Sequence, residues 1–244
     1  MRTPLVAAMT ALMILTVPLG AAAQTEEPDR PATAEENLEI DDVKERALAA
    51  IDARLDTIAR LRERITSHPH VTGEHQGELL GELGRAEAGL HSLAAEIRTA
   101  ESMVELRVLV PKIAEDFRIY LVVVPKVNLV LGSDSVVAAA GRLGEAAELL
   151  QSWIDRAADA GYDVTEAEAH LAEMRRQIAD AVSLGAPVAA AVLPLTAADW
   201  PDPAERILAD ARAGLVAARQ LLGGALESGH EVVKALRGLL QRTA

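Results

Sequence analysis

From about residue 39 to the end of the chain, apolar residues recur at alternating spacings of three and four. This spacing places them on one stripe of a helix, because an α-helix makes one turn in about 3.6 residues. One stripe runs without a break from Leu79 to Ala100, and another extends from Leu208 to Leu239. A chain patterned in this way buries its stripes by packing helices against each other, so we predict an all-α fold.

Start and stop signals divide the pattern into separate helices. Pro69 disfavours helical geometry at the preceding residue, and Thr72 is a good N-cap for the next helix. Ser102 begins a further helix with a capping-box pattern, and Asp163 begins another in the same way. Gly161 occupies the position where a left-handed residue ends a helix.

Short connections make successive helices run antiparallel. We therefore expect residues 39–244 to form one helical bundle domain. Its architecture should be an elongated antiparallel up-and-down bundle of five or six long helices with heptad-like seams. Aromatic residues make up 2 % of the chain and cysteine is absent, so Leu, Val, Ile and Ala must fill the core. The lack of cysteine excludes disulfides, thiolate catalysis and Cys-ligated zinc.

The N-terminal residues predict export. A positive residue is followed by an apolar stretch over residues 5–19, and small residues at Ala21 and Ala23 mark a cleavage site. Residues 1–23 are therefore predicted to be a signal peptide. Residues 24–38 are acidic, polar and proline-containing, and we expect a disordered linker there. The mature protein should be soluble after cleavage, in the periplasm, at the cell envelope or outside the cell.

Residues 117–131 form a dense apolar run that the stripe pattern does not explain. Pro125 lies inside it, and β-branched residues are frequent. Two alternatives are a kinked, fully buried helix and a short strand-like segment. A third is a membrane-active element that leaves the bundle and enters lipid. We do not favour membrane contact, because the run is short for a bilayer and contains Lys126 and Asn128.

Charge and histidine placement limit the possible ligands. The formal net charge of −13 repels phosphate backbones, so no nucleic-acid partner is expected. His68, His70 and His75 lie close together between two helices, and imidazoles are ligands for zinc, copper or nickel. Their spacing fixes no coordination geometry. We therefore predict neither a metal nor another cofactor, and a metal-binding envelope protein using this loop stays an alternative.

Two lysines border the apolar run. Lys112 and Lys126 each follow a proline and would share a face of one continuous helix, with Arg118 as a third positive group for an anionic ligand. We expect instead that the prolines bend the helix and that the lysines extend to water.

The sequence contains no catalytic motif. A nucleophile elbow, a phosphate-binding glycine loop and HExxH are all missing, so we predict no catalytic residue and no enzyme activity. At DFRIYLVVVPKV (residues 116–127) and TAADWPDP (residues 196–203) the chain resembles a loose group of uncharacterised, coiled-coil-like exported helical proteins of GC-rich bacteria. The resemblance implies a helical exported protein and assigns no activity to any residue.

These observations favour a non-catalytic exported helical bundle with an interaction or structural role. Its partner would be a protein, or a second copy of the same chain.

Overall fold

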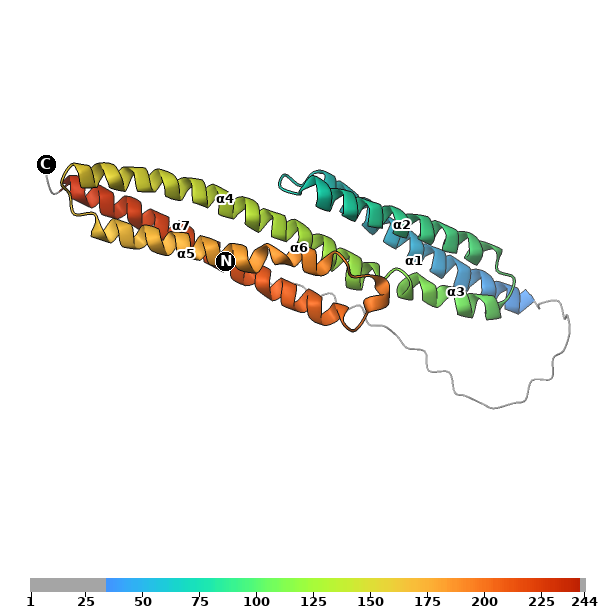
Figure 1. Cartoon of the computed structure of the whole chain (residues 1–244). Helices are drawn as coiled ribbons and strands as arrows, with labels where there is room; N and C mark the ends of the chain where they lie inside the picture. Colours follow the sequence, from blue (N-terminus) through green and yellow to red (C-terminus); the bar gives the residue numbers. More distant parts are fainter. Residues whose placement is uncertain (1–33, 242–244) are drawn as a thin grey trace, which may run out of the picture.

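The computed structural model describes residues 34–241, which form helices joined by short connections (Figure 1). In chain order these are α1 (Ala34–Thr66), α2 (Gly73–Thr99), α3 (Met103–Glu115), the π-helical segment η1 (Ile119–Val123), α4 (Val124–Asp159), α5 (Thr165–Gly185), α6 (Pro187–Val192), the 3₁₀ segment η2 (Ala197–Asp199) and α7 (Ala204–Gln241). No strand occurs in this part of the chain, so the all-α prediction is confirmed there. The predicted signal peptide lies outside the described residues.

Two groups of helices lie end to end and share α4. Figure 1 shows α1, α2 and α3 packed together at one end and α4, α5 and α7 packed together at the other. The short helix α6 covers the first part of α4. With 36 residues, α4 is about 54 Å long, and it runs from the junction of the two groups to the C-terminal tip.

Helix α1 begins earlier than the sequence analysis placed it. Residues 34–38, assigned to the disordered linker, are the first residues of α1, and the rest of that linker lies outside the described residues. Alanine and glutamate are strong helix formers, so the helix begins before the first apolar residue of its stripe.

Most of the predicted helix ends agree with the structure. The side chain of Thr72 accepts a hydrogen bond from the backbone N–H three residues later, as an N-cap does. The side chain of Ser102 does the same, although the carboxylate of Glu105 accepts from the N–H of Glu101, one residue before the cap. Gly161 has the predicted positive φ, 85°.

The predicted capping box at Asp163 is wrong. Val164 is the N-cap residue of α5 and makes no side-chain cap hydrogen bond. The carboxylate of Asp163 instead accepts from the backbone N–H and hydroxyl of Thr165, at 3.1 and 2.7 Å. This short turn occupies the carboxylate of Asp163, which is the acceptor that a capping box would need.

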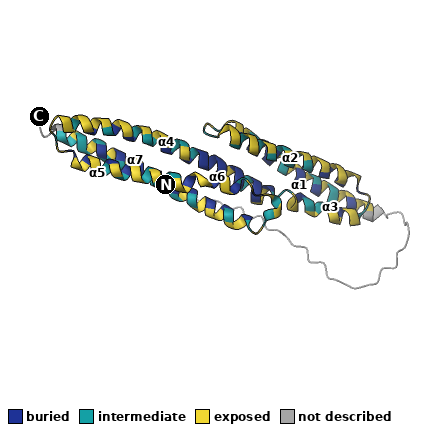
Figure 2. Ribbon diagram, in the orientation of Figure 1, coloured by how far each residue is buried: buried dark blue, intermediate teal, exposed yellow. Residues whose placement is uncertain are grey.

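The predicted stripes face the interior (Figure 2). One cluster of buried side chains fills the α1–α3 group and the junction, and a second fills the tip between α4, α5 and α7. The second cluster consists of small and aliphatic residues: Ala147, Leu150, Ile154, Val164, Ala167, Leu171, Met174, Ala225 and Val232.

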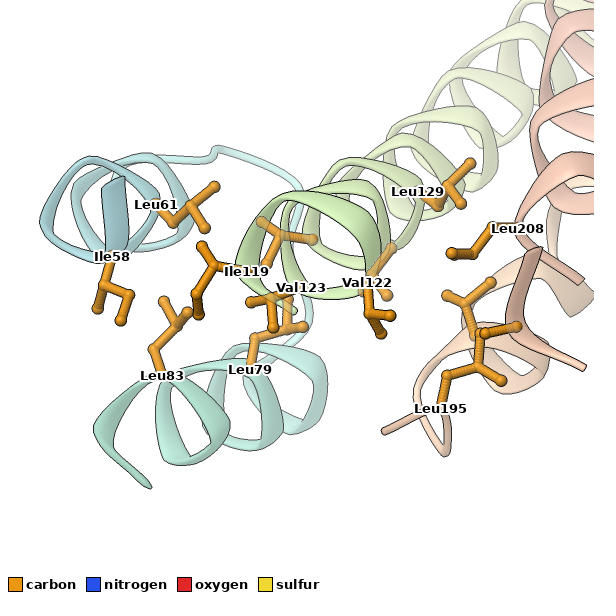
Figure 3. Close-up of a cluster of buried hydrophobic side chains, with 14 of the residues drawn as sticks. Ile58, Leu61, Leu79, Leu83, Ile119, Val122, Val123, Leu129, Leu195 and Leu208 are labelled. Carbon is orange, nitrogen blue, oxygen red and sulfur yellow. The ribbon is translucent and has the colours of Figure 1, made fainter. Parts of the chain in front are cut away.

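The apolar run at residues 117–131 is helical and lies at the junction, where η1 leads into α4. Figure 3 shows Ile119 and Val123 among side chains of α1 and α2, whereas Val122 and Leu129 lie toward Leu195 and α7. The run therefore joins the two groups of helices. The strand-like alternative is wrong, because η1 and α4 pair their backbone groups along the helix.

One apolar stretch in the described residues would be long enough to cross a membrane. It lies within residues 103–159 and qualifies by length and composition only, with 61 % of its most apolar window buried inside the protein. A core helix of a folded domain has the same properties.

Candidate functional site

The loop between α1 and α2 brings the three candidate histidines against α4. His68 Nε2 lies 3.2 Å from the hydroxyl oxygen of Ser135, and His70 Nε2 lies 3.3 Å from the guanidinium of an arginine on α4. His75, in the first turn of α2, contacts Asp134 through Nδ1, 2.8 and 3.0 Å from the two carboxylate oxygens. Each histidine thus has its own partner, and the three do not converge on one point.

Asp134 is the centre of this contact. Its side chain is 6 % exposed, and its carboxylate accepts the backbone N–H of Thr72 at 3.1 Å in addition to Nδ1–H of His75. The neighbouring Ser133 is also buried and donates to the carbonyl of Gly185 at 2.8 Å. Buried polar groups are stable only when they are hydrogen-bonded, so this segment of α4 fixes where both the loop and α5 dock.

The pair of His68 and Ser135 resembles a base and a nucleophile, but its hydrogen bonds oppose that chemistry. Nδ1 of His68 accepts the backbone N–H of His70, so the neutral ring carries its proton on Nε2 and donates it to Ser135. The hydroxyl of Ser135 in turn donates to the carbonyl of Leu131 at 2.7 Å. Neither ring nitrogen of His68 is left to take a proton from the serine.

The electrostatic surroundings of His68 agree with a neutral ring. Burial lowers the pKa of His68, and the neighbouring His70 and Arg64 act in the same direction, whereas Asp134 opposes them. The imidazole is therefore held in its uncharged form near pH 7.

A metal ion needs several ligands directed at one point. Among residues 34–241, no three His, Asp or Glu side chains are placed to hold one. His75 comes closest to a ligand, because Asp134 orients its ring as a carboxylate orients a metal-bound histidine. His75 and Asp134 are nevertheless not part of a group of three such side chains among residues 34–241.

A second buried polar centre surrounds Lys126. The expectation that this lysine extends to water is wrong: it is 1 % exposed, and its ammonium donates to both carboxylate oxygens of Glu82 at 2.8 Å. It also donates to the carbonyl of Leu195. Lys126 lies in the first turn of α4, where the packing of α2 and the α6–η2 connection closes over it. The ion pair therefore links three segments that are distant in the sequence.

Arg118 marks the joint between α3 and η1. It is the one non-glycine residue with positive φ among the described residues, at φ 40° and ψ 42°. Its carbonyl accepts the N–H groups of Leu121, Val122 and Val123, at 3.1, 2.8 and 3.4 Å. Its buried Nε has no hydrogen-bond partner. Left-handed backbone is unfavourable for arginine, so the surrounding packing holds this turn in place.

A groove hollows the surface at the C-terminal tip. Its volume is about 760 Å³, and it lies between the end of α4, the loop before α5 and the last turns of α7. Trp153 and Tyr162 line it together with aliphatic side chains, and Arg156 and Arg237 stand among them. Trp153 is 41 % exposed. Because the whole chain has two tryptophans and two tyrosines, this pairing of aromatic residues is a marked concentration.

No protein-family model, curated protein or solved structure matches this chain.

Sequence reasoning missed both Asp134 and the tip groove. Asp134 had one signal, a polar Gly-Ser-Asp-Ser run inside an apolar helix. Charged residues in such a run have to find partners when they are buried. The groove had no comparable signal, because its residues come from two helices and a loop that meet only in the folded chain.

Proposed function

We propose that this chain is an exported, non-catalytic interaction protein that acts at the cell envelope or outside the cell. In this proposal the helices form an antiparallel up-and-down bundle of five or six members with heptad-like seams. The bundle presents the tip groove to a protein partner, which inserts an apolar peptide segment.

The residues that line the groove carry this proposal. Tryptophan, tyrosine and arginine are the residue types that contribute most of the binding free energy at protein interfaces. All three occur here, in Trp153, Tyr162, Arg156 and Arg237, around an apolar floor. A groove of this size also falls in the usual range of ligand-binding clefts, about 300–1,000 Å³.

Helix ends favour a peptide over an anionic lipid in this groove. Helices α4 and α7 both have their C-termini at the tip (Figure 1). The C-terminal end of a helix carries partial negative charge and disfavours an anionic head group. The hydrogen bonds of His68 support the non-catalytic part, since they commit both ring nitrogens to holding the loop.

The test is capture from an envelope extract of the producing cell by three immobilised proteins. Trp153→Ser removes one of the two aromatic side chains of the groove, and Leu226→Ser is the matched control, because Leu226 is 50 % exposed on α7 and does not line the groove. We expect one protein to bind the wild type and the control and to be lost with Trp153→Ser. Equal capture by all three proteins, or no specific capture, would contradict the proposal.

A second candidate is a membrane-active protein that inserts residues 117–131. The observation in its favour is the apolar window within residues 103–159. Sedimentation with neutral phosphatidylcholine vesicles separates the two: the interaction protein stays in the supernatant, and the membrane-active protein sediments.

A further inference from the structure

A second hollow, of about 400 Å³, lies where α1, α4 and α7 meet at the junction of the two helix groups. Three arginines line it: Arg64 from the last turn of α1, and Arg212 and Arg219 from α7. Asn128 of α4 lies among them. The remaining walls are valine, leucine and proline side chains of α4 and α7.

No acidic side chain lines this pocket. The neighbouring pocket around Lys126 is different, because its lining includes Glu82 and Asp116 beside the cations. Arg64 donates to the amide oxygen of Asn128 at 2.7 Å, which is an uncharged acceptor. Three arginines thus line one hollow that no carboxylate lines, although the chain carries a net charge of −13.

The two arginines of α7 also lack a partner along their own helix. Within the described residues, neither Arg212 nor Arg219 makes an ion pair, and the positions three and four residues away from each hold apolar or small side chains. Arg206, one and a half turns earlier on α7, is 3.8 Å from the carboxylate of Asp210. Arg212 and Arg219 are exposed like most arginines of this helix, but unlike Arg206 they have no carboxylate beside them in this part of the chain.

Gly132 gives Arg219 its place against α4. A side chain at position 132 would put its Cβ 3.0 Å from the Nη2 atom of Arg219 and 2.8 Å from Leu215. The guanidinium therefore lies directly over bare backbone, on a glycine that is itself buried. A larger residue at position 132 would therefore displace Arg219 and Leu215, which both line the pocket.

We propose that this pocket binds a phosphate group, either of a soluble phosphomonoester or of a phospholipid head group. A phosphate group carries up to two negative charges and three acceptor oxygens, which match the planar donor forks of arginine. The amide N–H₂ of Asn128 supplies a further donor, since its oxygen is already occupied by Arg64. The apolar walls accommodate the carbon chain that bears the phosphate. The site is separate from the tip groove and does not depend on it.

Isothermal titration calorimetry of the mature protein tests the proposal, with inorganic phosphate and glycerol phosphate as probes. We expect saturable binding at one site, weakened about tenfold or more by Arg212→Gln and by Arg219→Gln, because a hydrogen bond to a charged group contributes about 1.5–3 kcal/mol. Arg206→Gln removes the same charge from the same helix outside the pocket and should leave the affinity unchanged. Melting of each variant without ligand separates loss of binding from loss of the fold.

Vesicles distinguish the two sources of the phosphate group. Binding of the soluble probes without sedimentation on phosphatidylglycerol vesicles assigns a soluble phosphomonoester. Sedimentation on those vesicles, absent with phosphatidylcholine and lost with Arg212→Gln, assigns a lipid head group. The proposal is overturned if neither probe nor vesicle binds, if Arg206→Gln weakens binding as much as Arg212→Gln, or if citrate binds and phosphate does not.

Discussion

Replacing Glu82 by glutamine measures how strongly the ion pair at Lys126 holds the helix groups together. The ammonium of Lys126 is buried and has three acceptors, two of them the carboxylate oxygens of Glu82 and the third the carbonyl of Leu195. Glu82→Gln keeps the size of the side chain and one acceptor, but it leaves a buried positive charge without its counter-charge.

The expected loss follows from the burial of the two partners. Removing one member of a buried pair costs about 3–5 kcal/mol. The side chain of Glu82 is 24 % exposed, so water partly screens the charge that remains, and we place the loss at about 2–3 kcal/mol. In a chain of this size each kcal/mol lowers Tm by about 2–4 °C, so Tm should fall by roughly 4–12 °C.

Thermal unfolding followed by far-UV circular dichroism measures this shift. Glu78→Gln, one turn earlier on α2 and exposed, is the matched control and should leave Tm unchanged. The double variant Lys126→Met, Glu82→Gln removes both charges and leaves the carbonyl of Leu195 without its donor, at a cost of about 1–3 kcal/mol. The losses measured for Glu82→Gln alone and for Lys126→Met alone should therefore not add to the loss in the double variant. A Glu82→Gln protein that melts like the control, or strictly additive losses, would refute this reasoning.

Three further substitutions test the junction, the histidine loop and the helix contacts. In a denaturant titration, Val122→Asp should lower the free energy of unfolding by about 3 kcal/mol or more, because Val122 is fully buried. Leu121→Asp, at a site 44 % exposed, should change it by less than about 0.5 kcal/mol. Unchanged stability of Val122→Asp would favour membrane insertion. Because burial lowers the pKa of His68, the unfolded chain binds that proton first as pH falls below about 6.5, so stability should decline toward about pH 5, and His68→Gln should remove part of the decline. Identical pH profiles of the two proteins would contradict this. Gly185→Ala places a Cβ 2.5 Å from a valine of α4 and should lower the free energy of unfolding by about 1–3 kcal/mol. Gly141→Ala, with nothing within 4 Å, should raise it by up to about 1 kcal/mol. Shifts of Tm in the same direction for both variants would show that the close contact at Gly185 does not determine the stability.

The sequence predicts the helices well because their signals are local. Apolar spacing, the cap at Thr72 and the left-handed end at Gly161 each depend on a few neighbouring residues, and the structure agrees with all three. The capping box at Asp163 fails for the same kind of reason, since another local partner, Thr165, takes the carboxylate.

The polar contacts could not be predicted, because their partners are distant in the chain. Lys126 looks like a residue that reaches water until α2 places Glu82 beside it, 44 positions away. Asp134 likewise depends on a loop 59 to 62 positions earlier. Spacing along one helix shows which side chains point inward, but not which segment meets them there.

The described chain starts and ends at opposite extremes of the long axis (Figure 1). α1 begins at Ala34 beside α3, and α7 ends at Gln241 at the tip. Tension applied between these two points would act parallel to the helix axes. Side chains interlocked along α4 would then have to slide past one another together, instead of separating one turn at a time. The force needed to unfold the chain in this direction should be far higher than the force needed when the first residue of α1 and the last residue of α2 are pulled apart.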